Sequence, residues 1–447
     1  MSKSLMWKLA AIGGLIILLL IPLGMVNGLV SDRQHYRQQA IASIADGTAG
    51  SQTLAGPVWV LPYKQLMLEP IDGKPDQHRE VWRDRTTALL PDKLSVAGQL
   101  KTETRQRGIY RTQVYSTELA VTGHFQLPIR AGLAADTQIQ WGQPYLSVGI
   151  ADVRGIKTSP RINWGSSTLD FAPGARLKAL GGGIHANLAA YDGAAASIPF
   201  SFKLSLNGMD DLNVVPLGRD TEVSLQSDWR HPSFSGRFSP EDRAVSDKGF
   251  TARWRTSWFS TNLSEHFEQC ATSSQCEPFQ NARLGVRLIE PVDAYLQTDR
   301  AVKYGFLFVF LTFCTFFLTE VLKRIAIHPV QYALVGLSLA VFFLLLLSFS
   351  EQWAFGPAYL LAALACVTQN AFYASHALGS RWRGLGFAGL LSALYGLLYV
   401  LLRSEDHALL LGSLLLFGLL TTVMVLTRKL NWYDLASPPK SQNEETV

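Results

Sequence analysis

Charged residues are scarce in this chain of 447 residues: they make up 17% of it, whereas hydrophobic residues make up 48%. Residues 31–300 hold 29 basic and 28 acidic residues and are almost neutral, while the two flanks hold 11 basic and 7 acidic residues. Nucleic-acid binding needs Lys and Arg gathered on one surface, so this distribution argues against it. The high hydrophobic content also excludes a largely disordered chain.

The sequence motifs of common catalytic and metal sites are missing as well. The nine histidines form no HExxH pair, and the chain contains neither a GxSxG elbow nor a P-loop. A scattered set of Ser, His and Asp residues is expected by chance in a chain of this size. We therefore predict no catalytic residue, no cofactor and no metal site, and we do not expect an enzyme.

Cysteine is also rare, with four in the chain. Cys314 and Cys366 lie in apolar runs, where packing is the simplest role. Cys270 and Cys276 lie six residues apart in the polar central part. Neither a CxxC motif nor a nearby His completes a metal-ligand set there, so the sequence favours a disulfide, which requires an oxidising compartment.

Long apolar runs, in contrast, are abundant at both ends. A helix needs about 20 apolar residues to cross a bilayer, and six runs qualify: Leu9–Val30, Tyr304–Leu322, Gln331–Phe349, Trp353–Ala374, Gly384–Leu402 and His407–Leu426. A cleaved signal peptide is the alternative for the first run. That run is longer than the apolar part of a typical signal peptide, about 7–15 residues, so a permanent anchor is favoured.

The basic residues in the short connections predict the orientation, because Lys and Arg accumulate on the cytoplasmic side. With the N-terminus inside, eight of them face the cytoplasm: Lys3, Lys8, Lys323, Arg324, Arg381, Arg383, Arg428 and Lys429. Arg403 is the one basic residue in the short outer connections, and Arg300 and Lys303 border the large exported part. We predict six spans, both termini in the cytoplasm, and residues 31–300 across the membrane.

The exported part is expected to begin with a helix over residues 31–50 that continues the anchor. Alternating apolar residues then predict antiparallel strands with Leu119, Phe200, Val223 and Phe250 on their inner faces, and the last of these strands is expected to place Trp258 on the same face as Phe250. The fold class is therefore a mixed membrane protein. It has four parts: an anchor helix (1–30), a large mainly-β, sandwich-like domain (31–300), a five-helix transmembrane bundle (301–430) and a short tail (431–447). Whether the domain forms one or two β units stays open.

The most distinctive exported segment is Asp228–Pro240, which combines aromatic and basic residues. Its candidate partner-binding residues are Trp229, Arg230, His231, Phe234 and Arg237. Aromatic stacking on a glycan or an envelope protein is one interpretation. The alternative is a turn whose aromatic rings pack under the β core, which is the commoner use of such residues.

Polar residues at mid-membrane depth would favour a transport path. The sequence offers Thr312, Thr315 and Thr319 on one stripe, and Gln369 with Asn370 in another run, but no ionisable group at mid-bilayer. Hydrogen bonds between helices are the simpler role for these residues.

Several strings resemble the CreD family of bacterial inner-membrane proteins, in both parts and in the same order. They are GPVWVLPY (56–63), SVGIADVRGI (147–156), LNVVPLGRD (212–220), SDWRHPSFSGRF (227–238), FSTNL (259–263), LQTDRAVKYGFLF (296–308), HPVQYALVGLSLAVFFLLLLSFSE (328–351) and ALLLGSLLLF (408–417). The Cys270 and Cys276 pair gains no support from this resemblance.

The resemblance implies an inner-membrane location with residues 31–300 in the periplasm. It also implies a role in cell-envelope integrity and in envelope stress, including the β-lactam response, under a two-component regulon. It supplies no catalytic residue. The expected partners are the lipid bilayer and an envelope protein or glycan, with the oligomeric state left open. A transporter or a hydrolase acting on an envelope component is the alternative function.

Overall fold

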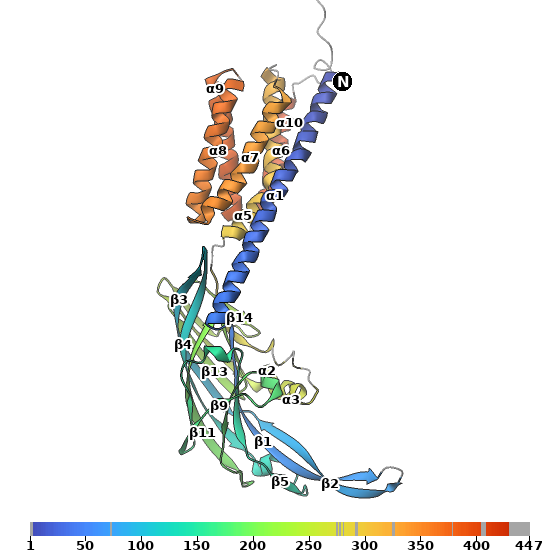
Figure 1. Cartoon of the computed structure of the whole chain (residues 1–447), viewed down its shortest axis with the longest axis vertical. Coiled ribbons are helices and arrows are strands. Elements are labelled where there is room, and N and C mark those ends of the chain that lie inside the picture. The colour runs from blue at the N-terminus through green and yellow to red at the C-terminus, as the bar shows by residue number, and fades with distance from the viewer. Residues whose placement is uncertain are drawn as a thin grey trace, which may run out of the picture. The chain divides into compact units, whose positions relative to one another are not determined.

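The computed structural model describes residues 3–428 except 72–73, 274–275, 277–278, 280, 291–293, 324–326, 378 and 404–407. The predicted tail, 431–447, lies outside the described residues. The chain divides into two compact units (Figure 1). The helical unit comprises Met1–Arg37 and Val292–Val447, and the β unit comprises Gln38–Pro291.

The helical unit contains α1 (Lys3–Gly47) as far as Arg37, and the helices α5 (Ala294–Lys303), α6 (Gly305–Lys323), α7 (Pro329–Ser350), α8 (Phe355–Ala377), α9 (Arg381–Arg403) and α10 (Ala408–Thr427). Helix α1 continues 45 residues without a break, so the expected extension of the anchor is confirmed, although it ends at Gly47. Helix α7 begins at a capping box, in which His328 accepts from the backbone and Gln331 bonds back to the cap.

Four helices in the described residues are long and apolar enough to cross a bilayer: α1, α7, α8 and α9. A fifth span results if α5 and α6, which meet at a 45° bend, are counted together. The sixth predicted run coincides with α10, whose side chains are described only in part. Membrane-spanning helices are thus present, while the count of six and the orientation stay predictions.

The outer surfaces of these helices are apolar. On α1, Ile17, Ile21 and Met25 are 60–68% exposed, and Leu360 and Phe372 of α8 are equally open. Such a surface is unfavourable in water and is stable against lipid chains. It therefore implies a lipid bilayer as the surroundings of this unit.

The β unit contains two sheets in the described residues. Sheet A has nine strands: β14 (Pro232–Gly236), β17 (Leu284–Leu288), β12 (Asp211–Val215), β1 (Gln52–Ile71), β6 (Tyr145–Ile150), β10 (Gly183–Asn187) and β9 (Ala172–Pro173), with β2 (Lys74–Leu89) and β5 (Ile139–Trp141) paired to β1. Sheet B has eight strands: β15 (Asp242–Ser246), β16 (Gly249–Ser257), β13 (Asp220–Ser227), β3 (Lys93–Arg107), β4 (Tyr110–Leu127), β11 (Ala196–Met209), β7 (Arg161–Trp164) and β8 (Ser167–Asp170). Short 3-10 turns, η1 (Ile129–Gly132), η2 (Val153–Gly155) and η3 (Lys178–Leu180), connect strands.

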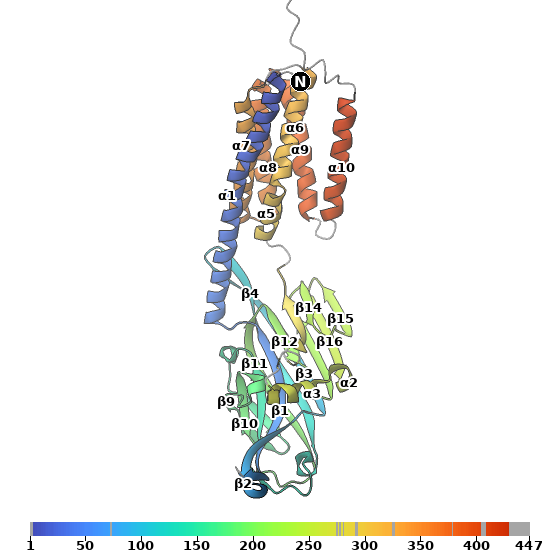
Figure 2. The ribbon, with the colours of Figure 1, turned by 90° about the vertical axis from the view of Figure 1, so that its right-hand side faces the viewer.

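The two sheets enclose one hydrophobic core, so the β unit is a single sandwich. Figure 2 shows this unit from the side on which α3 lies. Sheet A contributes Trp59 and Val148, and sheet B contributes Leu119, Phe200 and Trp254. The inner faces expected from the period-two pattern are confirmed, because Leu119, Val223 and Phe250 are at most 2% exposed.

Two details of the sequence prediction were wrong. The strands are not all antiparallel, since β1 pairs with β12 and β3 pairs with β13 in parallel. Trp258, expected on the inner face of the strand that begins at Phe250, instead starts the short helix α2 (Trp258–Thr261) and is 40% exposed. The strand ends at Ser257, so the alternation stops one residue too early to bury Trp258.

A third layer covers part of the outer face of sheet A. Helix α3 (Leu263–Ser273) buries Phe267 and Cys270 against Val58 and Val60 of β1. Strand β1 is thus buried on both faces in this region. That burial explains the continuous apolar stretch of β1, which differs from the alternation of the half-exposed strands.

The junction between α1 and β1 is fixed by Asp152, which lies between β6 and η2. Its carboxylate accepts from the Gly50 amide at 3.0 Å and from two nitrogens of the Arg154 guanidinium at 2.7 and 2.9 Å. Its backbone is held by the fully buried Gln52 side chain, which donates to the Asp152 carbonyl and accepts from its amide.

This junction gives a pH-dependent prediction. The hydrogen bonds from Arg154, followed by those from backbone amides, lower the pKa of Asp152 from 3.8 to about 2. Because the pKa is lower in the folded state, the stabilisation is complete above about pH 4 and is lost as the pH falls towards 2. We expect Asp152→Asn to lower the free energy of unfolding by about 1–2 kcal/mol at pH 7.

The measurement is tryptophan-monitored unfolding of the intact detergent-solubilised protein between pH 2 and pH 7. The difference between wild type and Asp152→Asn should shrink as the pH falls below 4. A difference that stays constant over this range would contradict the assignment.

Candidate functional site

The aromatic residues of Asp228–Pro240 pack on the core of the β unit. Trp229 donates its indole N–H to the carbonyls of His231 and Ile289 at 3.0 and 3.2 Å. Phe234 lies on β14 with its ring edge-on to Phe250 and Trp254. These contacts match the alternative interpretation, in which the rings are structural.

The charged residues of the same segment lie outside. Arg230, His231 and Arg237 are exposed, and Asp228 fastens the start of the segment by accepting from the amide and hydroxyl of Thr102. Of the five candidate residues, Arg230, His231 and Arg237 are thus exposed and Trp229 and Phe234 are half-buried, and partner binding by them stays a prediction. The basic side chains stay available for a partner, while Trp229 and Phe234 support the backbone that presents them.

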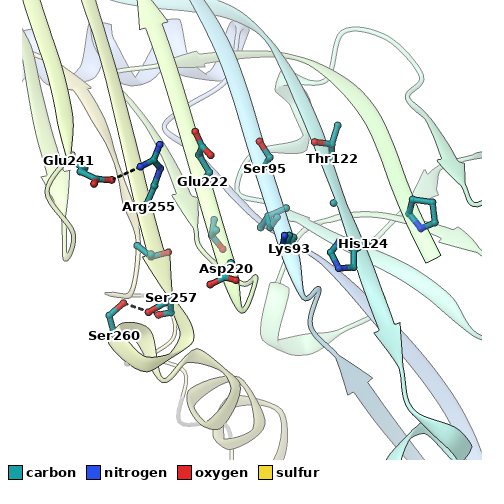
Figure 3. Close-up of a pocket in the computed structure, with 15 residues that line it drawn as sticks. Lys93, Ser95, Thr122, His124, Asp220, Glu222, Glu241, Arg255, Ser257 and Ser260 are labelled. Carbon is teal, nitrogen blue, oxygen red and sulfur yellow. Dashed lines mark hydrogen bonds and ion pairs between the residues drawn. The ribbon is translucent and has the colours of Figure 1, made fainter. Parts of the chain in front are cut away.

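A groove of about 950 Å³ lies on the outer face of sheet B (Figure 3). Two rows of paired strand residues form it. In the strand order β16, β13, β3 and β4, the first row is Ser257, Asp220, Lys93 and His124, and the second row is Arg255, Glu222, Ser95 and Thr122. The short side chains of Ser95 and Thr122 leave space between longer charged neighbours, which produces the hollow.

Ion pairs hold the charged walls of the groove in place. Arg255 pairs with Glu241 at 3.6 Å, and Arg253, next to the groove, pairs with Glu222 at 3.5 Å. The carboxylate of Asp92 lies 3.3 Å from the His124 ring, and its other oxygen lies 3.6 Å from Arg219. The walls thus offer both charge signs and several hydroxyl groups.

A packing constraint keeps this part of sheet B in shape. Gly123 lies between Thr122 and His124 on the inner face, and a Cβ there would lie 2.7 Å from the Phe200 ring and 2.1 Å from the Lys93 carbonyl. The Phe200 ring therefore occupies the space that a side chain at position 123 would need, so this position requires glycine. Phe200 in turn packs against Phe125 of the same strand as Gly123, so the groove rests on a rigid core.

The hydroxyl and imidazole groups of the groove lie apart from one another. Ser257 and His124 lie in the same row but three strands apart, or about 14 Å at normal strand spacing. In the described part of the chain His124 bonds to Asp92 and to no hydroxyl group, so no Ser is aligned with it. No group of three potential metal ligands is found among the described residues either.

Two aromatic residues, Trp258 and Phe259, lie between the groove residues Ser257 and Ser260 in the sequence. Ser260 of α2 lines the groove, and in the same short helix Trp258 carries the Arg219 guanidinium over its ring at 4.4 Å. Phe259 is 87% exposed. Aromatic faces beside hydroxyls and carboxylates are suited to sugars and to polar peptides alike.

A family model described as "Inner membrane protein CreD" matches residues 4–433, which is nearly the whole chain. The chain belongs to the CreD family. A curated relative, inner membrane protein CreD of Escherichia coli (strain K12), is 35% identical over 449 residues, and the match covers 100% of this chain and 98% of the relative. The resemblance drawn from the sequence is confirmed, and this CreD-family chain is an inner-membrane protein.

The sequence did not reveal the groove of this CreD-family protein, because most of its residues come from four strands, β3, β4, β13 and β16, whose pairing register cannot be read from the sequence. The sequence did indicate which residues of each alternating strand face outwards, such as Arg253 and Arg255 of β16. A polar outer face is also what any solvated sheet shows.

The polar membrane residues of this CreD-family chain are engaged in local hydrogen bonds. Thr312, Thr315 and Thr319 each donate to the carbonyl four residues earlier in α6. Asn370 of α8 donates to the Ser338 hydroxyl of α7 at 2.9 Å. The predicted hydrogen bond between helices is thus found for Asn370, whereas the three threonines bond within their own helix.

Cys270 and Cys276 are joined by a disulfide in this CreD-family structure. On intact cells we expect a membrane-impermeant maleimide to label neither residue until a reductant is added. Cys314 is half-buried and Cys366 is buried in the helical unit, so they should stay unlabelled throughout. Mass spectrometry of the tagged peptide measures the outcome, with Cys270→Ser/Cys276→Ser as the control, and labelling without reductant would contradict the disulfide.

Proposed function

We propose that this CreD-family protein supports cell-envelope integrity and the envelope-stress response, including the response to β-lactams, by binding an envelope partner through its β unit. The partner is an envelope protein or glycan, and the protein acts without catalysing a reaction. The groove on the outer face of sheet B carries this proposal, because it is large, polar and mounted on a rigid sheet.

The composition of the groove supports a polar partner. Hydroxyls of Ser95 and Thr122 can donate and accept hydrogen bonds, and carboxylates of Asp220 and Glu222 accept them. Lys93 adds a donor that suits the carboxylates of a peptide or an acidic sugar. Interfaces with such partners are commonly wet and polar at the rim, with an aromatic anchor, and Phe259 supplies an exposed ring nearby.

The test is crosslinking in live cells from a photoreactive residue placed at Ser95, on the groove floor. The matched control is Glu103, which points to the same face of the same strand about 26 Å away. We expect a crosslinked envelope component from position 95 and none from position 103. Equal products from both positions, or none from either, would overturn the proposal.

A second pair of variants connects binding to physiology. Thr122→Trp fills the groove, whereas Glu103→Trp adds the same ring away from it. We expect the first to reduce survival under β-lactam stress to the level of a deletion strain and the second to leave it unchanged. Photoreactive residues at Arg230 and Arg237 then show whether the Asp228–Pro240 segment also contacts the partner.

A further inference from the structure

A row of uncharged polar residues continues the groove across the outer face of sheet B. Ser95 of β3 pairs with Thr122 of β4, and Thr122 pairs with Ser201 of β11. Ser201 pairs with Asn163 of β7, which pairs with Thr168 of β8. Paired residues of neighbouring strands point to the same side of a sheet. Five hydroxyl or amide groups therefore lie side by side, and we call these five residues the polar row.

The polar row begins where the charged part of the groove ends. Glu222 pairs with Ser95, and Arg255 pairs with Glu222. Figure 3 shows these side chains in line with Thr122. Arg255 in turn has its ion pair with Glu241. From Ser95 onwards the row carries no charge, so a ligand that follows it needs no charge of either sign.

Hydrogen bonds along the polar row hold its side chains in place. The Thr168 hydroxyl donates to the Asn163 Oδ1 at 3.0 Å, and the Asn163 Nδ2 donates to the Ser201 Oγ at 3.2 Å. An amide nitrogen has a second proton, and the Ser201 hydroxyl keeps its own proton to donate. Ser201 is half-buried and the other four members of the row are exposed. The row is thus preorganised and still able to bond to a ligand.

A second row of short side chains runs beside the polar row. Ala97 pairs with Ala120, and Ser224 pairs with Ala97. Ala97 and Ala120 lie two positions from Ser95 and Thr122 on the same strands, so they share the outer face at a distance of about 7 Å. Hydroxyl groups beside methyl groups are suited to a ligand that also carries hydroxyls and small methyl groups, as acetylated amino sugars do.

The spacing of the polar row corresponds to the repeat of a linear polysaccharide. Neighbouring strands lie about 4.8 Å apart, and one pyranose ring with its glycosidic oxygen extends a β-1,4-linked chain by a similar distance. Each sugar can therefore face one strand. The twist of a sheet turns successive side chains by about 20–25°. A polymer with rotatable linkages can follow this twist, whereas a rigid planar ligand cannot.

We propose that the polar row binds a linear, uncharged glycan of acetylated amino sugars that lies across the strands from β3 to β8. The sugar hydroxyls and amides bond to the row, and acetyl methyl groups contact Ala97 and Ala120. Each such hydrogen bond contributes little on its own, so several in series supply the affinity. This inference rests on the proposed function, because the row begins in the groove, and it narrows the envelope partner to a glycan.

The test is isothermal titration of the full-length protein with β-1,4-linked N-acetylglucosamine oligomers of increasing length, in a detergent without a sugar head group. We expect the affinity to rise with each added sugar up to about five units, one for each strand of the row, and then to stay constant. Glucose oligomers of the same linkage lack the acetamido group and should bind about fivefold more weakly. Absence of binding, or an affinity that does not depend on chain length, would overturn the proposal.

Ser201 and Ser205 form a matched pair for substitution. Both lie on the outer face of β11, about 13 Å apart, but Ser205 pairs with Glu118 and lies outside the polar row. Ser201→Ala should weaken binding of the five-unit oligomer about fivefold, and Ser205→Ala should leave it unchanged. Equal effects of the two variants would contradict the placement of the glycan. Thermal melting of both variants shows that a loss of binding is not a loss of folding.

The photoreactive residue at position 95 separates this inference from the proposed function. If that position captures a protein in live cells and the oligomers do not bind, the proposed function stands and the glycan assignment is wrong. If the oligomers bind as expected and position 95 captures nothing in cells, the glycan site stands and the proposed function is overturned.

Discussion

Replacing Glu320 by Ala is expected to destabilise the helical unit by about 3–5 kcal/mol, because the change leaves a paired ammonium group without its counter-charge. Glu320 of α6 is 8% exposed and pairs with Lys8 of α1. It also accepts from the Tyr332 hydroxyl of α7 at 2.9 Å and from the Ile327 amide at 3.2 Å. One carboxylate thus joins three segments of the unit.

Thermal unfolding in detergent measures this effect. The double variant Lys8→Met/Glu320→Met removes both charges and should recover most of the loss, since an apolar pair of similar size is often as stable as a buried ion pair. Tyr332→Phe removes one hydrogen bond and should cost about 1 kcal/mol. A Glu320→Ala variant as stable as wild type would show that the pair contributes nothing.

The second large effect is expected at Trp254, where Trp254→Ala should lower the stability of the β unit by about 3–5 kcal/mol. Trp254 of β16 is 1% exposed in the core between the sheets. Its ring meets Phe234 of β14 at 5.9 Å, which ties sheet B to the edge strand of sheet A. Its removal therefore leaves a cavity where the two sheets meet.

Trp254→Phe is the informative control for this prediction. The Trp254 indole N–H is buried and has no hydrogen-bond partner in the described residues, so a Phe ring loses volume but no hydrogen bond. We expect a loss of no more than about 1.5 kcal/mol. Urea unfolding of the intact protein gives both values, and equal losses for the Ala and Phe variants would show that ring volume is not what matters.

Because Phe234 packs on Trp254, two variants can distinguish a structural role from a binding role in the Asp228–Pro240 segment. Phe234→Ala should lower stability because its ring packs on Trp254 and Phe250, whereas Arg237→Ala should not, because Arg237 is exposed. Any effect of Arg237→Ala on envelope function with unchanged stability would therefore reflect partner binding.

The sequence revealed those features that depend on periodicity alone. Apolar runs at both ends predicted the membrane helices, and alternation predicted which faces of β4, β11 and β16 are buried. Both patterns are set by the geometry of a single element. The helix α3 was missed, because its short stretch from Leu263 carries polar residues around a few apolar ones and follows directly on strand patterns.

Features that depend on the pairing of strands far apart in the chain could not be predicted from the sequence. The parallel pairing of β3 with β13 places Lys93 beside Asp220, and this neighbour relation creates the groove. The aromatic rings at 229 and 234 were ambiguous for the same reason, since only the position of β16 shows that a core lies beneath them. The sequence of a strand predicts which of its faces is polar and which is apolar. The strands that pair with it are known only from the structure.

The parallel pairing of β1 with β12 has a consequence for biogenesis. Gln52 meets Leu212, a partner synthesised 160 residues later, and β17 completes the same ladder only at Leu288. Contacts of such high sequence separation form slowly. During synthesis the apolar strand β1 must therefore wait with one hydrogen-bonding edge open, so its maturation should depend on chaperones that shield nascent strands.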